Sequence, residues 1–137
     1  MIVDSNIVIE LLHGNGDRAE RIFEAYVELR AVGFAAINPV IFAECASGSP
    51  SKGSFENRLA ELRLAVEPLS NSDAFRAGHA FREYRRKGGP RQAILPDFLI
   101  GAQASMHGWR ILTRDPKRFS SYFPEVELID PLRDHDD

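Results

Sequence analysis

The chain has 137 residues, of which 44% are hydrophobic and 27% are charged, and its formal net charge is −3 at neutral pH. These values are ordinary for a globular protein of one domain, and they argue against nucleic-acid binding through overall charge. The chain has no apolar run long enough to span a bilayer and does not begin with a secretion-signal pattern, so we expect a cytoplasmic protein with no membrane partner.

Short apolar runs alternate along the chain with helical patterns. The apolar runs predict strands at 1–3, 34–37, 66–69, 110–113 and 126–129, and the helical patterns, capping residues included, cover 7–12, 17–33, 39–44, 55–64, 72–88, 97–108 and 116–119. This alternation predicts an α/β sandwich with a mainly parallel central sheet flanked by helices. We expect a single domain over residues 1–132 and a flexible tail at 133–137.

Three features of the first half bear on packing. The helix at 17–33 has an apolar stripe that is expected to bury Ile22, Phe23, Tyr26 and Val27. The segment Ser47–Ser54 is rich in glycine and serine and predicts a flexible loop. Cys45 is the only cysteine, which excludes an intramolecular disulfide, and a buried thiol is favoured over a catalytic one.

Four acidic residues follow or interrupt apolar segments. Asp4 and Asp115 follow predicted strands, Asp97 begins a helix, and Glu44 lies inside an apolar stretch. Since ligands of such folds bind outside the carboxyl ends of the strands, we expect these acids to converge there. Clustered carboxylates repel one another unless a cation is present, and Mg²⁺ or Mn²⁺ prefers oxygen ligands. The pattern therefore predicts a divalent-metal site suited to phosphoryl chemistry.

Each acid also has a purely structural interpretation. Asp4 and Asp97 can cap helices and Asp115 can belong to a turn, whereas Glu44 in an apolar helix needs a partner. The basic residues of 76–91, together with those flanking Asp115 (Arg114, Lys117 and Arg118), form either a basic rim for RNA phosphates or a solvated surface.

The chain resembles the PIN-domain nucleases and, within them, the VapC-like toxins of toxin–antitoxin pairs. Four segments carry the resemblance in order: IVDSN at 2–6, AE at 43–44, LPDFLIGA at 95–102, and ILTRD at 111–115 with Phe119 behind it. The resemblance implies a PIN-domain-like three-layer sandwich. It also implies an endoribonuclease that uses Mg²⁺ (or Mn²⁺), cleaves an RNA substrate, pairs with a cognate antitoxin protein and forms a homodimer.

The same resemblance assigns roles to individual residues. It implies that Asp4, Glu44, Asp97 and Asp115 are the catalytic, metal-binding acids. It implies that the supporting polar residues are Asn6, Ser5 and Thr113. The chain departs from the family pattern at Ser5, where threonine is common, and at 116–118, where some members carry a further acid.

Two other functions remain open at this point. One is a non-catalytic PIN module that binds metal or a partner without turnover. The other is a haloacid-dehalogenase-like phosphohydrolase with Asp4 as its covalent nucleophile, for which Asn6 stands where a second aspartate is required.

Overall fold

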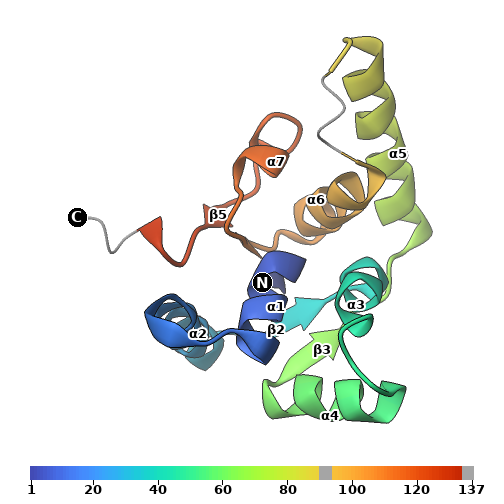
Figure 1. The fold of residues 1–137 in the computed structure, drawn as a ribbon. Helices are drawn as coiled ribbons and strands as arrows, with labels where there is room; N and C mark the ends of the chain where they lie inside the picture. Colours follow the sequence, from blue (N-terminus) through green and yellow to red (C-terminus); the bar gives the residue numbers. More distant parts are fainter. Residues whose placement is uncertain (90–93, 134–137) are drawn as a thin grey trace.

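The computed structural model describes residues 1–89 and 94–133. Within them the chain forms five strands and seven helices (Figure 1). The strands are β1 (Ile2–Val3), β2 (Ala35–Ile37), β3 (Leu64–Val66), β4 (Ile111–Leu112) and β5 (Leu128–Ile129). The helices are α1 (Ser5–His13), α2 (Gly16–Ala31), α3 (Pro39–Ala46), α4 (Lys52–Glu61), α5 (Asn71–Arg86), α6 (Leu95–His107) and α7 (Lys117–Ser120).

The strands form one sheet in the order β3-β2-β1-β4-β5, and every pairing is parallel. This confirms the predicted α/β class. From β1 at the centre, the chain adds β2 and β3 on one side and later returns to add β4 and β5 on the other. The order therefore reverses between β1 and β4, and the carboxyl ends of these two strands border the position where such sheets bind ligands.

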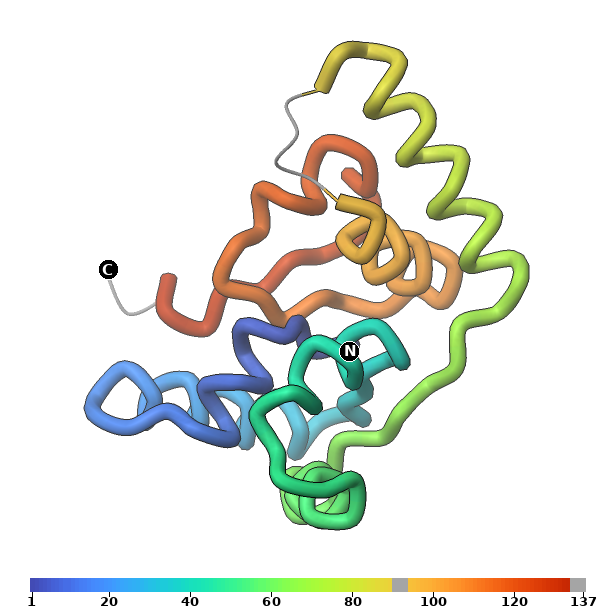
Figure 2. The backbone as a smooth tube through the Cα atoms, turned by 45° about the vertical axis from the view of Figure 1, so that its right-hand side comes forward, coloured from blue at the N-terminus to red at the C-terminus, as the bar shows by residue number. Residues whose placement is uncertain are grey.

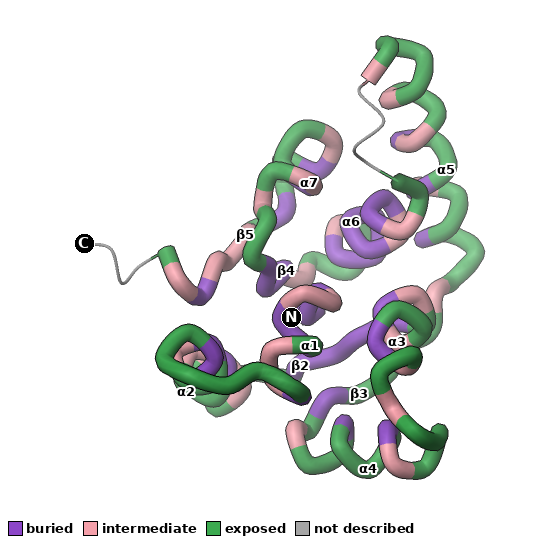
Figure 3. The backbone as a smooth tube through the Cα atoms, viewed as in Figure 1, coloured by how far each residue is buried: buried purple, intermediate pink, exposed green. Residues whose placement is uncertain are grey.

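The core is formed by the strands together with helix α6. Strands β1, β2 and β4 are fully buried, and Figure 3 shows β2, β4 and α6 as largely buried, whereas α2 and α4 expose much of their surface. Helix α5 lies alongside α6 (Figure 2), and Phe98 of α6 contacts Phe81 and Tyr84 of α5 with ring centroids 5.3 and 5.5 Å apart. These contacts fix the first turn of α6, which carries Asp97.

Local sequence signals set several boundaries as predicted. Asn38 caps α3 by accepting a hydrogen bond from the backbone N–H of Ile41 at 2.9 Å, with Pro39 in the first turn. Gly108 ends α6 in the left-handed region, with φ of 68°. Asparagine before proline is typical of a helix start, and glycine is typical of a helix end.

Other boundaries and faces were predicted wrongly. Strand β3 begins at Leu64, two residues before the expected start, and Ser51 caps α4, so the expected loop Ser47–Ser54 ends early. Helix α5 is capped by Ser70, so it begins ahead of the predicted start at residue 72. Phe23 and Val27 are about half exposed because α2 lies at the periphery and buries only a narrow stripe of its surface (Figure 1).

The predicted tail falls almost wholly outside the described residues, which end at Arg133. Among the helices in the described ranges, none has the length and apolar character needed to cross a membrane.

Candidate metal centre

Asp4 is held at the carboxyl end of β1. It is 1% exposed and caps α1, with Oδ1 accepting a hydrogen bond from the backbone N–H of Ser5 at 2.8 Å. Oδ2 accepts a hydrogen bond from the hydroxyl of Thr113 at 2.7 Å. Because β1 and β4 are paired, with Val3 opposite Leu112, the residues that follow each strand meet here.

Thr113 joins Asp4 to the segment that carries Asp115. The threonine is fully buried, and its hydroxyl accepts a hydrogen bond from the backbone N–H of Asp115 at 3.0 Å while donating to Asp4. One hydroxyl therefore fixes the carboxylate that follows β1 and the backbone beyond β4. This position suits the supporting role predicted for Thr113.

Asp97 lies in the first turn of α6 and is 4% exposed. Its Oδ2 accepts a hydrogen bond from the backbone N–H of Ile94 at 3.3 Å. Burial raises the pKa of the Asp97 carboxyl; the charge of Arg118 opposes this rise, and the charges of Asp4 and Glu44 add to it. The charges of Asp4 and Glu44, which lie on other elements, thus influence the carboxyl of Asp97.

Arg118 lies among the acids. One guanidinium nitrogen, Nη2, pairs with Asp4, and the other, Nη1, donates to Oδ1 of Asp97 at 2.7 Å. Nε lies 3.6 Å from Oδ2 of Asp115, and the guanidinium carbon lies 4.9 Å from the centre of the Phe119 ring. Burial alone would lower the pKa of Arg118, but the charges of Asp4 and Asp97 outweigh this effect and raise the pKa.

From the sequence, Arg118 is expected either in a basic rim or on a solvated surface, with no part in the site. The available signal was its spacing of three residues from Asp115 at a helical turn, which puts two side chains on one face. Pairing with Asp4 and Asp97 depends on how α7 sits against the rest of the fold. That orientation is not encoded in any local pattern.

Glu44 occupies a different environment from the one expected. Helix α3 buries Ile41 and Cys45 and turns Glu44 to the surface, so Glu44 does not lie in the apolar surroundings that the sequence predicts. Glu44 still has a partner, because the hydroxyl of Ser5 donates to its Oε1. Its charge also reaches Asp97, so it lies at the border of the site.

Asn6 and Asp115 complete the predicted set. Oδ1 of Asn6 accepts a hydrogen bond from the backbone N–H of Arg114 at 3.3 Å, which ties α1 to the segment after β4. The side chain of Asp115 is 54% exposed, so it is the most solvated of the three acids around Arg118. The structure thus brings Asp4 and Asp97 together most closely, with Asp115 at their edge.

Cys45 is buried beside this site and has no features of a nucleophile. Burial and the neighbouring charges of Glu44 and Asp4 raise its pKa to about 12. The thiol is therefore protonated at neutral pH, as expected for a core residue.

A buried amide pair, which the sequence analysis missed, positions the acidic helices. The side-chain amide of Asn38 donates to Oε1 of Gln103 at 3.0 Å, and Gln103 donates to the carbonyl of Pro68 at 3.1 Å. The first bond holds the start of α3, which carries Glu44, against α6, which carries Asp97, and the second ties α6 to the segment after β3. The one signal was the polar Gln103 within the small and apolar run of α6.

The donor set can be compared with the needs of a divalent cation. In residues 1–89 and 94–133, no three Asp, Glu, His or Cys side chains stand together as an ion-binding group. Asp4 and Asp97 are directed at Arg118, and Glu44 is directed at Ser5. In chemistry the donors fit, because a hard divalent cation prefers oxygen ligands and Mg²⁺ commonly binds through one or two carboxylates.

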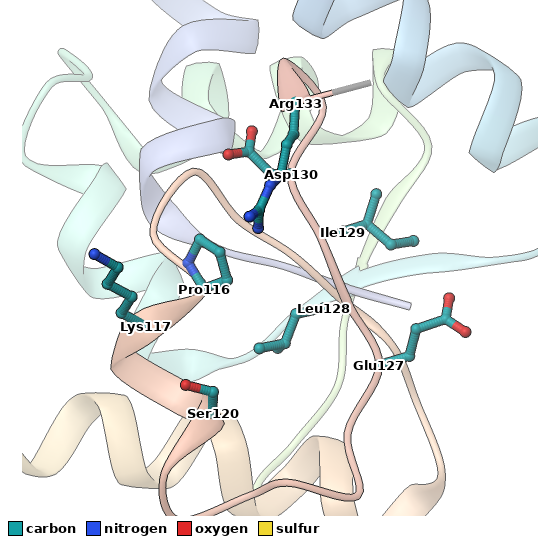
Figure 4. Close-up of a pocket in the computed structure, with 8 residues that line it drawn as sticks. All are labelled: Pro116, Lys117, Ser120, Glu127, Leu128, Ile129, Asp130 and Arg133. Atoms are coloured by element: carbon teal, nitrogen blue, oxygen red, sulfur yellow. The ribbon is translucent and has the colours of Figure 1, made fainter. Parts of the chain in front are cut away.

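A cavity of about 500 Å³ lies beside α7 and the edge strand β5 (Figure 4). Its lining contains none of the four acids and carries charges of both signs, namely those of Lys117, Arg133, Glu127 and Asp130. The cavity is therefore separate from the acidic centre.

Comparison with known proteins places this arrangement in context. The sequence model of the PIN domain matches residues 1–122. The fold is similar to VapBC2 from Rickettsia felis bound to a promoter DNA fragment, with a TM-score of 0.73 and 20% identity over 93% of this chain and 96% of that one. Comparison with curated proteins gives no match.

Two further solved structures show the same likeness. A toxin–antitoxin complex from Klebsiella pneumoniae has a TM-score of 0.67 and 25% identity over 95% of this chain and 96% of that one. DNA-bound VapBC from Salmonella typhimurium has a TM-score of 0.70 and 23% identity over the same shares, 95% and 96%.

Proposed function

Because this chain belongs to the PIN domain family, we propose that it is a metal-dependent endoribonuclease and the toxin of a toxin–antitoxin pair. The observation that carries the proposal is the pair of buried carboxylates, Asp4 and Asp97, that face one cation at the switch point of the sheet. The fold matches the one expected from the sequence, and the family's chemistry is the simplest function for two buried carboxylates at this position.

In this proposal Asp4 and Asp97 hold Mg²⁺ or Mn²⁺, and Glu44 and Asp115 complete the site from its edge. A bound divalent cation would supply positive charge for the phosphate oxygens and activate water for attack on the phosphodiester. Thr113 and the Ser5 backbone orient Asp4. The Ser5 hydroxyl orients Glu44, and Asn6 fixes the backbone beside Asp115. Orienting groups of this kind commonly tune metal affinity.

Basic side chains near the acids fit a polyanionic substrate. Arg114 and Lys117 flank Asp115 and are exposed. The exposed residues Arg82, Arg85 and Lys87 lie near the carboxyl end of α5, which packs on α6 through Tyr84 and Phe98. RNA phosphates bound by these residues would lie close to the carboxylates.

The proposed partners are a cognate antitoxin and a second copy of the chain, in the cytoplasm. The similar solved structures are toxin–antitoxin complexes, which supports the first partner. Exposed apolar side chains support protein contacts in general, and they include Phe23, Val27 and Val32 near α2 and Phe75 and Met106 on α5 and α6.

The test is cleavage of structured RNAs in Mg²⁺, Mn²⁺ or EDTA by the wild type and the Asp4→Asn variant. We expect cleavage that needs the cation and that the substitution abolishes, while circular dichroism shows a retained fold. Cleavage that persists in EDTA and in Asp4→Asn would contradict the proposal.

One observation favours a second candidate, the non-catalytic binding module. Arg118 already gives Asp4 and Asp97 a shared counter-charge, as it would in a protein without catalytic turnover. Mn²⁺ binding without cleavage of any RNA class would support that module. A trapped aspartyl-phosphate on Asp4 would instead support the phosphohydrolase.

A further inference from the structure

The oxygens of Asp4 and Asp97 have partners of two kinds. Three partners are fixed: the backbone N–H groups of Ser5 and Ile94 and the buried hydroxyl of Thr113. The other partner is the guanidinium of Arg118, which takes Oδ2 of Asp4 and Oδ1 of Asp97 at once. A divalent cation that binds between these two carboxylates must therefore compete with Arg118.

The fixed partners cannot easily leave. The N–H groups belong to the first turns of α1 and α6, and Thr113 is fully buried next to β4. Arg118 differs, since its side chain is 27% exposed and extends from α7, a helix of four residues. The long side chain can swing to solvent without disturbing the sheet, and Nε has no hydrogen-bond partner within the described residues.

Charge explains why some cation must be present. Two carboxylates almost out of contact with water repel each other and lose hydration, and one guanidinium leaves a formal charge of −1. A divalent cation at the same position would leave no net charge. The two carboxylates can thus bind either the guanidinium or a divalent cation, and the guanidinium balances less of their negative charge.

We propose that Arg118 is the resident cation of this centre: it holds Asp4 and Asp97 together in the metal-free protein and is displaced when a divalent cation binds. Arg118 then sets the metal concentration at which the site is filled. The inference rests on the proposed metal site and concerns binding, not cleavage.

The experiment measures Mn²⁺ affinity by calorimetry in the wild type and in Arg118→Gln, with Lys117→Gln as the matched control. The control removes the same charge from the same helix, and Lys117 has no ion pair with an acid among the described residues. We expect about tenfold tighter binding for Arg118→Gln, which corresponds to about 1.4 kcal/mol. Lys117→Gln should change the affinity by less than about twofold, as expected for a screened surface charge.

Thermal unfolding provides the second readout. In EDTA, Arg118→Gln should melt on the order of 10 °C below the wild type, because two buried carboxylates lose their counter-charge. Saturating Mn²⁺ should raise its melting temperature by more than it raises that of the wild type. If Arg118→Gln does not fold in EDTA, Arg118→Lys keeps one positive charge and should give changes of the same sign and smaller size.

Unchanged or weaker Mn²⁺ binding in both Arg118 variants would overturn the inference, whether or not the protein cleaves RNA. Tighter binding in a protein that cleaves no RNA would support the inference and count against the proposed nuclease. The two proposals therefore fail separately.

Discussion

Replacing Thr113 with valine tests how strongly the two strand ends depend on one hydroxyl. Valine keeps the shape of the buried side chain but removes the donor to Asp4 and the acceptor for the Asp115 backbone N–H, bonds of 2.7 and 3.0 Å. A hydrogen bond to a charged group contributes about 1.5–3 kcal/mol, and an unpaired buried group adds to the loss. We expect the free energy of unfolding to fall by about 2–3 kcal/mol.

The assay is thermal unfolding in EDTA, with Thr113→Ser as the control. For a chain of this length, a loss of that size lowers the melting temperature by roughly 7–10 °C. Serine keeps both hydrogen bonds and loses one methyl group, so it should cost only about 1 kcal/mol. Mn²⁺ affinity should fall at least about tenfold in the valine variant, as for other residues that orient a metal ligand. Equal stability of the valine variant and the wild type would refute this reasoning, as would equal losses for valine and serine.

Two other predictions concern packing and burial. Gly101→Ala should destabilise the fold by about 1–3 kcal/mol, because its Cβ would lie 2.3 Å from Cδ2 of Phe123. Gly78→Ala lies in the middle of α5, and apart from the neighbouring helix backbone no atom of the described residues is within 4 Å of the new Cβ. It should stabilise the fold by about 0.5–1 kcal/mol, and urea unfolding of both variants measures the difference. The buried Cys45 thiol has its pKa raised from 9.0 to about 12, so the unfolded state loses its proton first and stability falls between those pH values. Cys45→Ala should lack that part of the decline when unfolding is followed from pH 8 to pH 11, and identical pH dependence in the two proteins would contradict it.

The parts of the site that were predictable are those set by local pattern. Asp4 directly follows a short apolar strand and Asp97 follows a proline at a helix start, so each position was fixed by a few neighbouring residues. The parallel sheet then brings the strand ends together. The Asn38–Pro39 and Gly108 boundaries were predictable for the same reason.

The parts that were missed depend on contacts between distant elements. Arg118 meets residues 21 and 114 positions away, and nothing near it in the sequence encodes those contacts. The eight residues of α3 are too apolar for their pattern to reveal that Glu44 faces solvent. The same holds for Phe23 and Val27, whose exposure depends on how α2 rests at the edge of the fold.

The central claim is that the acids of this centre take part in RNA cleavage and do not only cap helices. One pair of variants tests it directly. Asp97 and Asp73 are both buried, and each accepts a hydrogen bond from the backbone N–H three residues before it, at 3.3 and 3.0 Å. Asp73 lies in the first turn of α5, where it forms a capping box with Ser70, and it has no ion pair with Arg118. The measurement is the rate of RNA cleavage in Mn²⁺ by Asp97→Asn and Asp73→Asn. We predict a loss of at least about a thousandfold for Asp97→Asn, on the scale of losing a group that stabilises the transition state, and a rate within a few-fold of the wild type for folded Asp73→Asn. Equal rates for the two variants would contradict the account.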